Sequence, residues 1–254
     1  MQRYYFDHNA TTPVSPEVLE AMLPVMTEVY GNASSIHHFG QAARQKLDAA
    51  RQQVAQALGA DPQEIVFTSG GTEADNLAIF GVGGHVVTTT MEHPAVLAAS
   101  AQLSHTLVPV DGRGMVEPEA IRRALQPETK LISVMHANNE TGAIQPIEAI
   151  ARIAAEAGIA LHSDGVQAAG KIPIRVSELG VALYSISGHK IGAPKGVGVL
   201  YVRKGTSIKP MIYGGRHERE RRGGTENVAG AVALGRAMQW IGEHGDAENR
   251  RLGG

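Results

Sequence analysis

Lys190 and Asp164 are two residues of this chain whose surroundings suggest covalent and ionic chemistry. Lys190 stands where an apolar run ends and a glycine-rich run begins, next to Ser187 and His189, and Asp164 ends an earlier apolar run. Neither charge is easily buried without a partner, so each is either solvated or used chemically. Asp164 could simply be the N-cap of a following helix. Together, however, a lysine that adds to an aldehyde and an acid that pairs with a pyridinium nitrogen are suited to pyridoxal 5'-phosphate (PLP).

A glycine-rich turn could supply the anion site that such a cofactor needs. Ser69, Gly70, Gly71 and Thr72 lie between a predicted strand and a predicted helix. The free N–H groups and the dipole of a helix N-terminus favour an anion, and glycine lets a phosphate approach the backbone. An ordinary strand-to-helix turn with Thr72 as a cap explains the motif equally well, because short glycine motifs are unspecific.

Further polar side chains follow other predicted strands and are expected at the same edge of the sheet. His93 precedes Pro94, where it is either the first residue of a helix or an imidazole laid flat over a planar cofactor. The other members of this polar set are His136, Asn138, Asn139, Glu140, His162 and Gln167. The histidines lack the spacing of metal ligands, so no metal site is expected.

The elements that must position these residues alternate between short strands and helices. The predicted strands, which are brief, apolar and β-branched, cover residues 65–68, 85–89, 106–110, 131–135, 159–163, 183–187 and 197–202. Helical periodicity marks residues 39–58 and 146–157, and a glycine stop signal follows each, Gly59 and Gly158. This alternation predicts an α/β fold with a mainly parallel seven-stranded sheet flanked by helices. In such sheets ligands lie beyond the carboxyl ends of the strands.

Composition limits the class of protein. The chain has 254 residues, 43% of them hydrophobic and 19% charged, which is enough for one large globular domain or two small ones. The net charge of −2 gives no reason to expect nucleic acid or an anionic membrane as a partner. No apolar run approaches the roughly 20 residues of a membrane span. The first residues, MQRYYFDHNATTP, lack the features of a secretory signal, so a cytoplasmic protein is expected.

Two segments near the end of the sequence are less informative. Residues 214–227, GGRHERERRGGTEN, form a charged run with glycine ends, and its arginines are expected on a solvated surface loop. Residues 228–241 are predicted to be helical, and the polar residues that follow are expected to leave the helix. A chain that stops just past a helix is typical of an incomplete protein, and a frayed natural terminus is the alternative.

Seven motifs taken together closely resemble the cysteine desulfurases of the NifS/IscS group, which are class V, fold-type I PLP enzymes. The motifs are DHNATTP, FTSGGTEADNLAI, TTTMEHPAV, MHANNETGAIQPI, HSDGVQAAGK, SGHKIGAPKGVGVLYVR and RRGGTENVAG. The resemblance runs from about residue 4 to about residue 240 without a long break. It implies an N-terminal segment over residues 1–15 and a PLP-binding large domain over residues 16–254, with the C-terminal small domain largely absent.

The resemblance also implies a role for each matching residue around the cofactor ring. Lys190 would carry the Schiff base and, once displaced by substrate, take the Cα proton as a general base. Asp164 would pair with the pyridinium nitrogen, and His93 would stack on the ring. Asn139 and Gln167 would hold the side of the ring that bears the phenolic oxygen.

The phosphate site implied by the resemblance draws on two subunits. Gly71, Thr72, Ser187 and His189 would bind the phosphate within one subunit. Thr225 would reach the phosphate of the neighbouring subunit, because the family is dimeric with its active sites near the interface.

The chain departs from the family's pattern in one respect, because it contains no cysteine. The family's nucleophilic cysteine, like the arginine that grips the substrate carboxylate, lies in a C-terminal region beyond these residues. The resemblance therefore implies a complete enzyme that converts L-cysteine to L-alanine and passes sulfur as a persulfide to an acceptor or Fe–S scaffold protein, while this chain alone forms no persulfide. Two other interpretations remain open: a class V lyase or aminotransferase for another amino acid, such as selenocysteine, and a catalytically silent module that binds the cofactor and dimerises.

Overall fold

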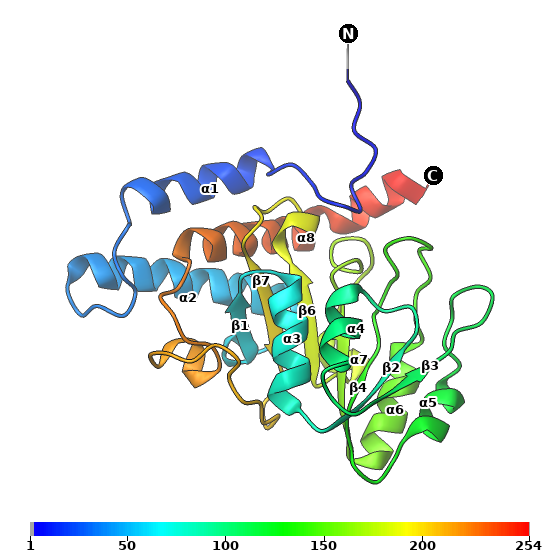
Figure 1. Cartoon of the computed structure of the whole chain (residues 1–254). Coiled ribbons are helices and arrows are strands. Elements are labelled where there is room, and N and C mark those ends of the chain that lie inside the picture. Colours follow the sequence, from blue (N-terminus) through cyan, green and yellow to red (C-terminus); the bar gives the residue numbers. More distant parts are fainter. Residues whose placement is uncertain (1–2, 254) are drawn as a thin grey trace.

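A seven-stranded sheet between two layers of helices organises the computed structural model, which describes residues 3–253 (Figure 1). The strand order across the sheet is β1-β7-β6-β5-β4-β2-β3. The strands are β1 (Ile65–Thr68), β2 (His85–Thr89), β3 (His105–Val108), β4 (Thr129–Ser133), β5 (Ala160–Asp164), β6 (Leu183–Ser187) and β7 (Gly198–Val202). The predicted α/β fold with seven strands is confirmed.

All neighbouring strands from β6 to β3 pair in parallel, whereas β7 runs antiparallel to both β6 and β1. The reversal of β7 has a simple cause, because residues 188–197 are too few for the crossover that a parallel connection needs. The sheet is therefore mainly parallel, as expected. Strand positions shift by one or two residues in β3, β4, β5 and β7, and β5 ends at Asp164 rather than at Ser163.

The helices cover the two faces of the sheet. They are α1 (Pro16–Thr27), α2 (His38–Leu58), α3 (Gly71–Val82), α4 (Pro94–Ser100), α5 (Pro118–Ala124), α6 (Ile147–Ala157), α7 (Val176–Leu179) and α8 (Val228–Gly253), with short 3-10 turns at Pro62–Glu64, Gly188–Lys190 and His217–Glu220. The predicted stop signals are confirmed, because Gly59 and Gly158 adopt the left-handed conformation, with φ of 68° and 65°.

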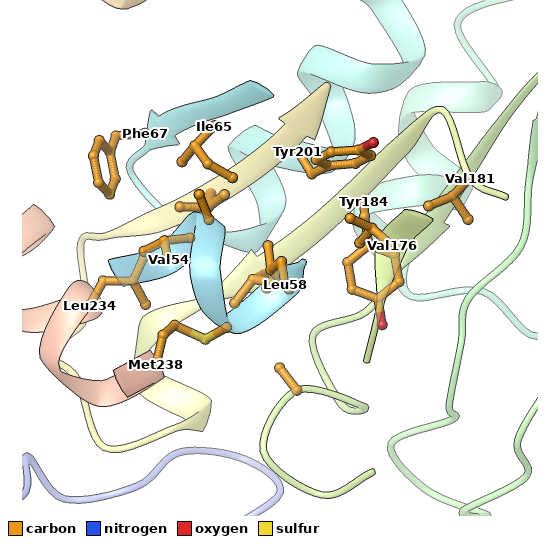
Figure 2. Packing of buried hydrophobic residues seen from close by; sticks show 14 of the residues in the cluster. Val54, Leu58, Ile65, Phe67, Val176, Val181, Tyr184, Tyr201, Leu234 and Met238 are labelled. Atoms are coloured by element: carbon orange, nitrogen blue, oxygen red, sulfur yellow. The ribbon is translucent and has the colours of Figure 1, made fainter. Parts of the chain in front are cut away.

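Alternate side chains of the strands enter two separate hydrophobic layers. In β1, Ile65 and Phe67 pack with α2 and α8, while Val66 faces α3 and α4 on the other side. Figure 2 shows the first of these layers, where Val54 of α2 and Leu234 of α8 lie against the sheet. This alternation fixes the register of each strand, because a slip by one residue would move every side chain to the opposite face of the sheet.

Helix α8 is longer than predicted. It continues past Ile241 to Gly253, whereas the sequence led us to expect that the helix ends at Ile241. The polar residues of this part pair along the helix surface, with Gln239 donating to Glu243 at 2.7 Å and Arg251 to Glu248 at 2.8 Å. Such i,i+4 and i,i+3 pairs stabilise an exposed helix that has little apolar surface to bury. No helix in the described part of the chain is long and apolar enough to cross a membrane.

The charged segment 214–227 is anchored by a buried ion pair. The Arg51 guanidinium on α2 donates to both carboxylate oxygens of Glu218, at 2.7 and 2.6 Å. Glu218 also accepts the backbone N–H of Phe67 at 2.9 Å. Glu218, Arg219 and Glu220 have positive φ angles of 45°, 56° and 65°, a conformation that is costly for residues other than glycine and that the buried pair holds in place.

The expectation of solvated arginines is wrong for two residues of this segment, Arg221 and Arg222. Arg221 is partly buried and donates to the backbone oxygen of Gln63 at 3.0 Å. Arg222 is only partly exposed and donates to Glu73 at the start of α3, at 2.9 Å. Arg216, by contrast, is largely exposed. A charge run alone does not reveal which of its residues bonds to a partner far away in the sequence. The Arg222–Glu73 pair joins segment 214–227 to the first turn of α3.

Candidate active site

One cavity of about 710 Å³ brings together nine of the ten predicted site residues. They are Gly71, Thr72, His93, Asn139, Asp164, Gln167, Ser187, His189 and Lys190. The cavity lies at the carboxyl ends of the parallel strands, where the topology places loops that are far apart in the sequence. The tenth residue, Thr225, is exposed and does not line this cavity, so its assignment to a neighbouring subunit remains a prediction.

Lys190 is positioned by the 3-10 turn that follows β6. Its Nζ donates to the backbone carbonyl oxygen of Ala10 at 2.9 Å and to that of Asn9. Partial burial lowers the pKa of Lys190, and the carboxylates of Asp164 and Asp7 oppose this shift. A lysine with a lowered pKa is more often neutral and hence more nucleophilic.

Asp164 is buried at the carboxyl end of β5. Its Oδ1 accepts the backbone N–H of Val166 at 2.9 Å. The alternative that Asp164 caps a helix is wrong, because turns follow it and the next helix, α7, begins only at Val176. Burial raises the pKa of Asp164, and the hydrogen bond from the Val166 N–H and the charge of Lys190 oppose this shift. A cationic partner within the cavity would therefore be strongly favoured.

The glycine-rich turn leaves backbone N–H groups free at the start of α3. The N-cap is Gly70, which has no side chain to cap the helix, so the reading of Thr72 as a cap is wrong. A Cβ on Gly71 would lie 2.9 Å from Cγ2 of Val166 and 3.3 Å from Cβ of Ser187, so a larger residue does not fit. The first N–H groups of the helix are thereby left available to an anion, with Ser187 and His189 also lining the cavity.

An acidic side chain, Glu73, lies close to this turn and needs a counter-charge. Although partial burial opposes it, the hydrogen bonds from Arg222 and Ser69 hold the pKa of Glu73 below its usual range. Arg222 Nε lies 2.9 Å from Glu73 Oε1. The pair reduces the repulsion that Glu73 alone would exert on a bound phosphate.

His93 starts a helix, as one interpretation of the sequence predicts, and its stacking on a cofactor ring stays a prediction. As the N-cap of α4, it accepts the N–H of Ala95 through Nδ1 at 3.1 Å. Its ring also lines the cavity. Capping therefore fixes the imidazole where it could lie against a planar ligand.

Glu92 is a residue of the site region that sequence reasoning missed. It is buried, and its carboxyl group accepts the hydroxyl of Thr89 at 2.6 Å and the backbone N–H of Met135 at 2.9 Å. These bonds join the ends of β2 and β4 directly beside His93. Burial raises the pKa of Glu92 to about 8.

We expect Glu92→Gln to reduce the pH dependence of stability. The folded chain binds the Glu92 proton more tightly than the unfolded chain, whose reference pKa is 4.5, so this group's contribution to the free energy of unfolding falls as pH rises through about 8. Glutamine removes that contribution, and urea unfolding between about pH 5 and pH 8 measures the difference. Glu20→Gln, at an exposed position, is the control. If the free energy of unfolding of Glu92→Gln depended on pH as strongly as that of the wild type, the raised pKa of Glu92 would be contradicted.

The other histidines of the predicted polar set turn away from the cavity. His162 is buried within hydrogen-bond distance of the hydroxyls of Ser133 and Ser185, at 2.8 and 2.9 Å. His136 lies 2.7 Å from the hydroxyl of Tyr184. Strand-end position alone therefore does not predict which face a side chain occupies.

Asn138 has a local structural role. Its Oδ1 accepts the backbone N–H groups of Glu140 and Thr141, each at 2.9 Å. This bonding shapes the loop that holds Asn139 and Glu140 against the cavity.

The N-terminal segment contributes residues to the cavity that sequence reasoning left without roles. Asp7, Asn9 and Ala10 line it. The backbone oxygen of Asn9 accepts from Gln167 at 3.0 Å, and its side-chain oxygen accepts from Lys171 at 2.9 Å. The motif DHNATTP carried the only signal, because a segment without periodicity gives no indication of where it packs.

The residues present match the chemical groups of PLP. A nucleophilic lysine, a buried carboxylate and a helix N-terminus lie around one cavity. The carboxyl of Asp75, also in the cavity wall, is buried and its Oδ1 has no hydrogen-bond partner among the described residues. The lysine suits the aldehyde of PLP, the buried carboxylate of Asp164 suits its protonated ring nitrogen, and the helix N-terminus suits its phosphate.

Comparisons with known proteins agree with this geometry. Residues 4–251 match the family described as aminotransferase class-V. The cysteine desulfurase IscS of Dictyoglomus turgidum is 49% identical over 98% of this chain, which spans 66% of that relative's length. A solved NifS-like protein superimposes with a TM-score of 0.94 at 42% identity, covering 97% of this chain and 71% of that one. A structure titled "SspA in complex with cysteine" gives a TM-score of 0.90 at 38% identity, covering 92% of this chain and 72% of that one.

The chain belongs to the class-V aminotransferase family and, within it, to the cysteine desulfurases of the NifS/IscS group. This family is PLP-dependent, and the resemblance inferred from the seven motifs is confirmed. The fold is likewise that of its fold-type I structural neighbours.

Proposed function

We propose that this chain is the PLP-binding large domain of a cysteine desulfurase, over residues 16–254, preceded by an N-terminal segment, residues 1–15, of which Asp7, Asn9 and Ala10 line the cavity. The observation that carries the proposal is the meeting of Lys190, Asp164 and the start of α3 around one cavity. The chain spans about two thirds of the curated relatives it matches, at 66% and 64% of their lengths. The reaction of the whole protein, L-cysteine to L-alanine with transfer of sulfur, is therefore part of the proposal.

Each residue of the ring site has a defined task in this proposal. PLP, when bound, supplies the electron sink that makes the substrate's Cα–H bond labile. Lys190 binds the cofactor covalently and afterwards holds the Cα proton on Nζ. Asp164 stays ionised to pair with the ring nitrogen, and His93 packs on the ring. Asn139 and Gln167 orient the ring from the side of its phenolic oxygen.

The phosphate site and the dimer are proposed together. Gly71, Thr72, Ser187 and His189 would bind the phosphate from within the chain. Thr225 would complete the site from the neighbouring subunit, since it is exposed and lies outside its own cavity. Its loop is joined to the start of α3 by the Arg222–Glu73 pair at 2.9 Å.

We expect Thr225→Val to weaken PLP binding about tenfold, because it removes one hydrogen bond to a charged group while preserving side-chain volume. Sedimentation identifies the dimer, and PLP titration under those conditions measures the affinity. Thr206→Val, at another threonine outside the cavity, is the control. An unchanged affinity in a dimeric Thr225→Val variant would contradict the role assigned to Thr225.

Sulfur transfer requires a nucleophile that this chain does not contain, since it has no cysteine. We propose that a cysteine outside these 254 residues attacks the sulfur of the substrate, and that a sulfur acceptor or Fe–S scaffold protein then receives it. L-Cysteine is the proposed substrate, as cysteine is the ligand named for the SspA structure. A cytoplasmic location remains a prediction from the sequence.

Product analysis on the full-length gene product tests this function. With L-cysteine we expect L-alanine and a protein persulfide in equal amounts. Alanine without a persulfide, or a strong preference for selenocysteine, would instead establish a lyase. PLP binding without any product would establish a catalytically silent module.

A further inference from the structure

A second carboxyl group, that of Asp75, lies buried beside the proposed cofactor site. Asp75 is on α3, one helical turn after Gly71, and is 1% exposed. It lines the cavity, and its Oδ1 has no hydrogen-bond partner among the described residues. Nε2 of His162 lies 3.5 Å from Oδ1 of Asp75, which is too far for a good hydrogen bond. An unpartnered buried oxygen on a cavity wall is costly unless something completes its bonding.

The groups that face Asp75 supply no positive charge. Asp164 of β5 and Glu92, which follows β2, are acids, and Ser185 of β6 offers only a hydroxyl. Burial lowers the pKa of His162 to about 3, so this imidazole is neutral. Burial, followed by the charge of Asp164, raises the pKa of Asp75 well above its usual value, although the Ser185 hydroxyl opposes this shift.

Asp75 and Asp164 therefore compete for a single negative charge. Both are buried and line the same cavity, and two neighbouring buried carboxylates cannot both ionise readily. The backbone N–H of Val166 and the charge of Lys190 act on Asp164 and so favour the negative charge there. The remaining proton then belongs on Asp75.

We propose that Asp75 is a positioning residue that stays protonated beside Asp164, so that the negative charge of the pair remains on Asp164 and the Asp75 O–H is a hydrogen-bond donor at that end of the cavity. This inference rests on the proposed function, because its consequence is a correctly charged Asp164 for the ring nitrogen of PLP. Asp75 acts through Asp164 and does not itself take part in proton transfer to substrate.

Two substitutions separate this role from a purely structural one. Asp75→Asn keeps a neutral donor of nearly the same shape, so we expect its affinity for PLP and the pH dependence of the visible spectrum of bound PLP to match the wild type. Asp75→Leu keeps volume but removes the O–H donor that supports the negative charge on Asp164, and we expect PLP affinity to fall about tenfold or more. The apoprotein of Asp75→Leu should be at least as stable as the wild type in urea, because the substitution removes an unpartnered buried oxygen.

Infrared spectroscopy reads the proton directly. The PLP-loaded wild type should show the C=O stretch of a protonated carboxylic acid, and part of that band should be missing in Asp75→Asn. Glu92 contributes a similar band, so the comparison is best made in a Glu92→Gln background. Loss of PLP affinity in Asp75→Leu that is matched by loss of apoprotein stability would overturn the proposal, as would an infrared band unchanged by Asp75→Asn. Absence of PLP binding in the wild type would instead refute the proposed function.

Discussion

Lys190→Ala is expected to abolish covalent attachment of PLP to this chain. Only a nucleophilic amine at the cavity can bond to the aldehyde, and burial lowers the pKa of Lys190 so that more of it is neutral. Incubation with PLP, reduction with borohydride and peptide mapping should place the modification of the wild-type chain on the peptide that contains Lys190. The variant should carry none at that position and lose the corresponding visible absorption.

Two other lysines make the test selective. Lys195 also lines the cavity, and Lys171 lies beside Asn9, whose backbone oxygen bonds Lys190. Lys46, exposed on α2, is a control for non-specific modification. Lys46→Ala should retain full labelling of Lys190. If Lys171 or Lys195 of Lys190→Ala were labelled as fully as Lys190 is in the wild type, the assignment of Lys190 as the lysine that binds PLP would be wrong.

Asp164→Asn is expected to weaken PLP binding by roughly a hundredfold or more, because it leaves a protonated ring nitrogen without its anionic partner. The same substitution should leave the apoprotein equally stable or more stable at neutral pH. Burial raises the pKa of Asp164 above 3.8, so the folded apoprotein binds this proton more tightly than the unfolded chain does. The contribution of Asp164 to stability therefore falls as pH rises above about 4, and asparagine escapes this loss.

Urea unfolding of the apoproteins and PLP titration together measure this trade-off. The stability difference between Asp164→Asn and wild type should shrink at acidic pH, where Asp164 is protonated in both states. Asp48→Asn, on the exposed side of α2, should change neither quantity by much. An Asp164→Asn chain that binds PLP normally but unfolds more easily at neutral pH would show that Asp164 is a structural residue only.

Several buried acids lie in the wall of the cavity or next to it, with few compensating charges. Burial raises the pKa values of Asp75, Glu92 and Asp164, and His162 is held neutral. A core built for stability alone would replace such groups by apolar ones. This arrangement is instead what a site for a cationic ring would need, and violations of simple burial rules are expected at functional sites.

Much of the site was predictable because each key residue follows an apolar run. Asp164 and Ser187 end buried strands, and parallel strands deliver their carboxyl ends to one edge of the sheet. The seven-strand alternation was equally visible, although β3, β4, β5 and β7 begin or end one or two residues away from their predicted positions. Terminal residues of strands are decided by pairing with neighbours, which the sequence does not display.

The missed features share a different cause. Their roles depend on partners that are distant in the sequence. Glu92 bonds to Met135, and Arg51 bonds to Glu218; Asp75 likewise lies near residues of other elements. Asp75 did leave a signal, since an acid on the buried face of α3 breaks the helix pattern. The continuation of α8 past Ile241 depended on surface pairs rather than on apolar periodicity.

A crystal structure of the chain grown with PLP tests the central claim most directly. We expect continuous density from Nζ of Lys190 to the cofactor, a carboxylate oxygen of Asp164 about 3 Å from the ring nitrogen, and the phosphate at the start of α3. PLP bound elsewhere, or bound in this cavity with Asp164 out of reach of the ring nitrogen, would contradict the account.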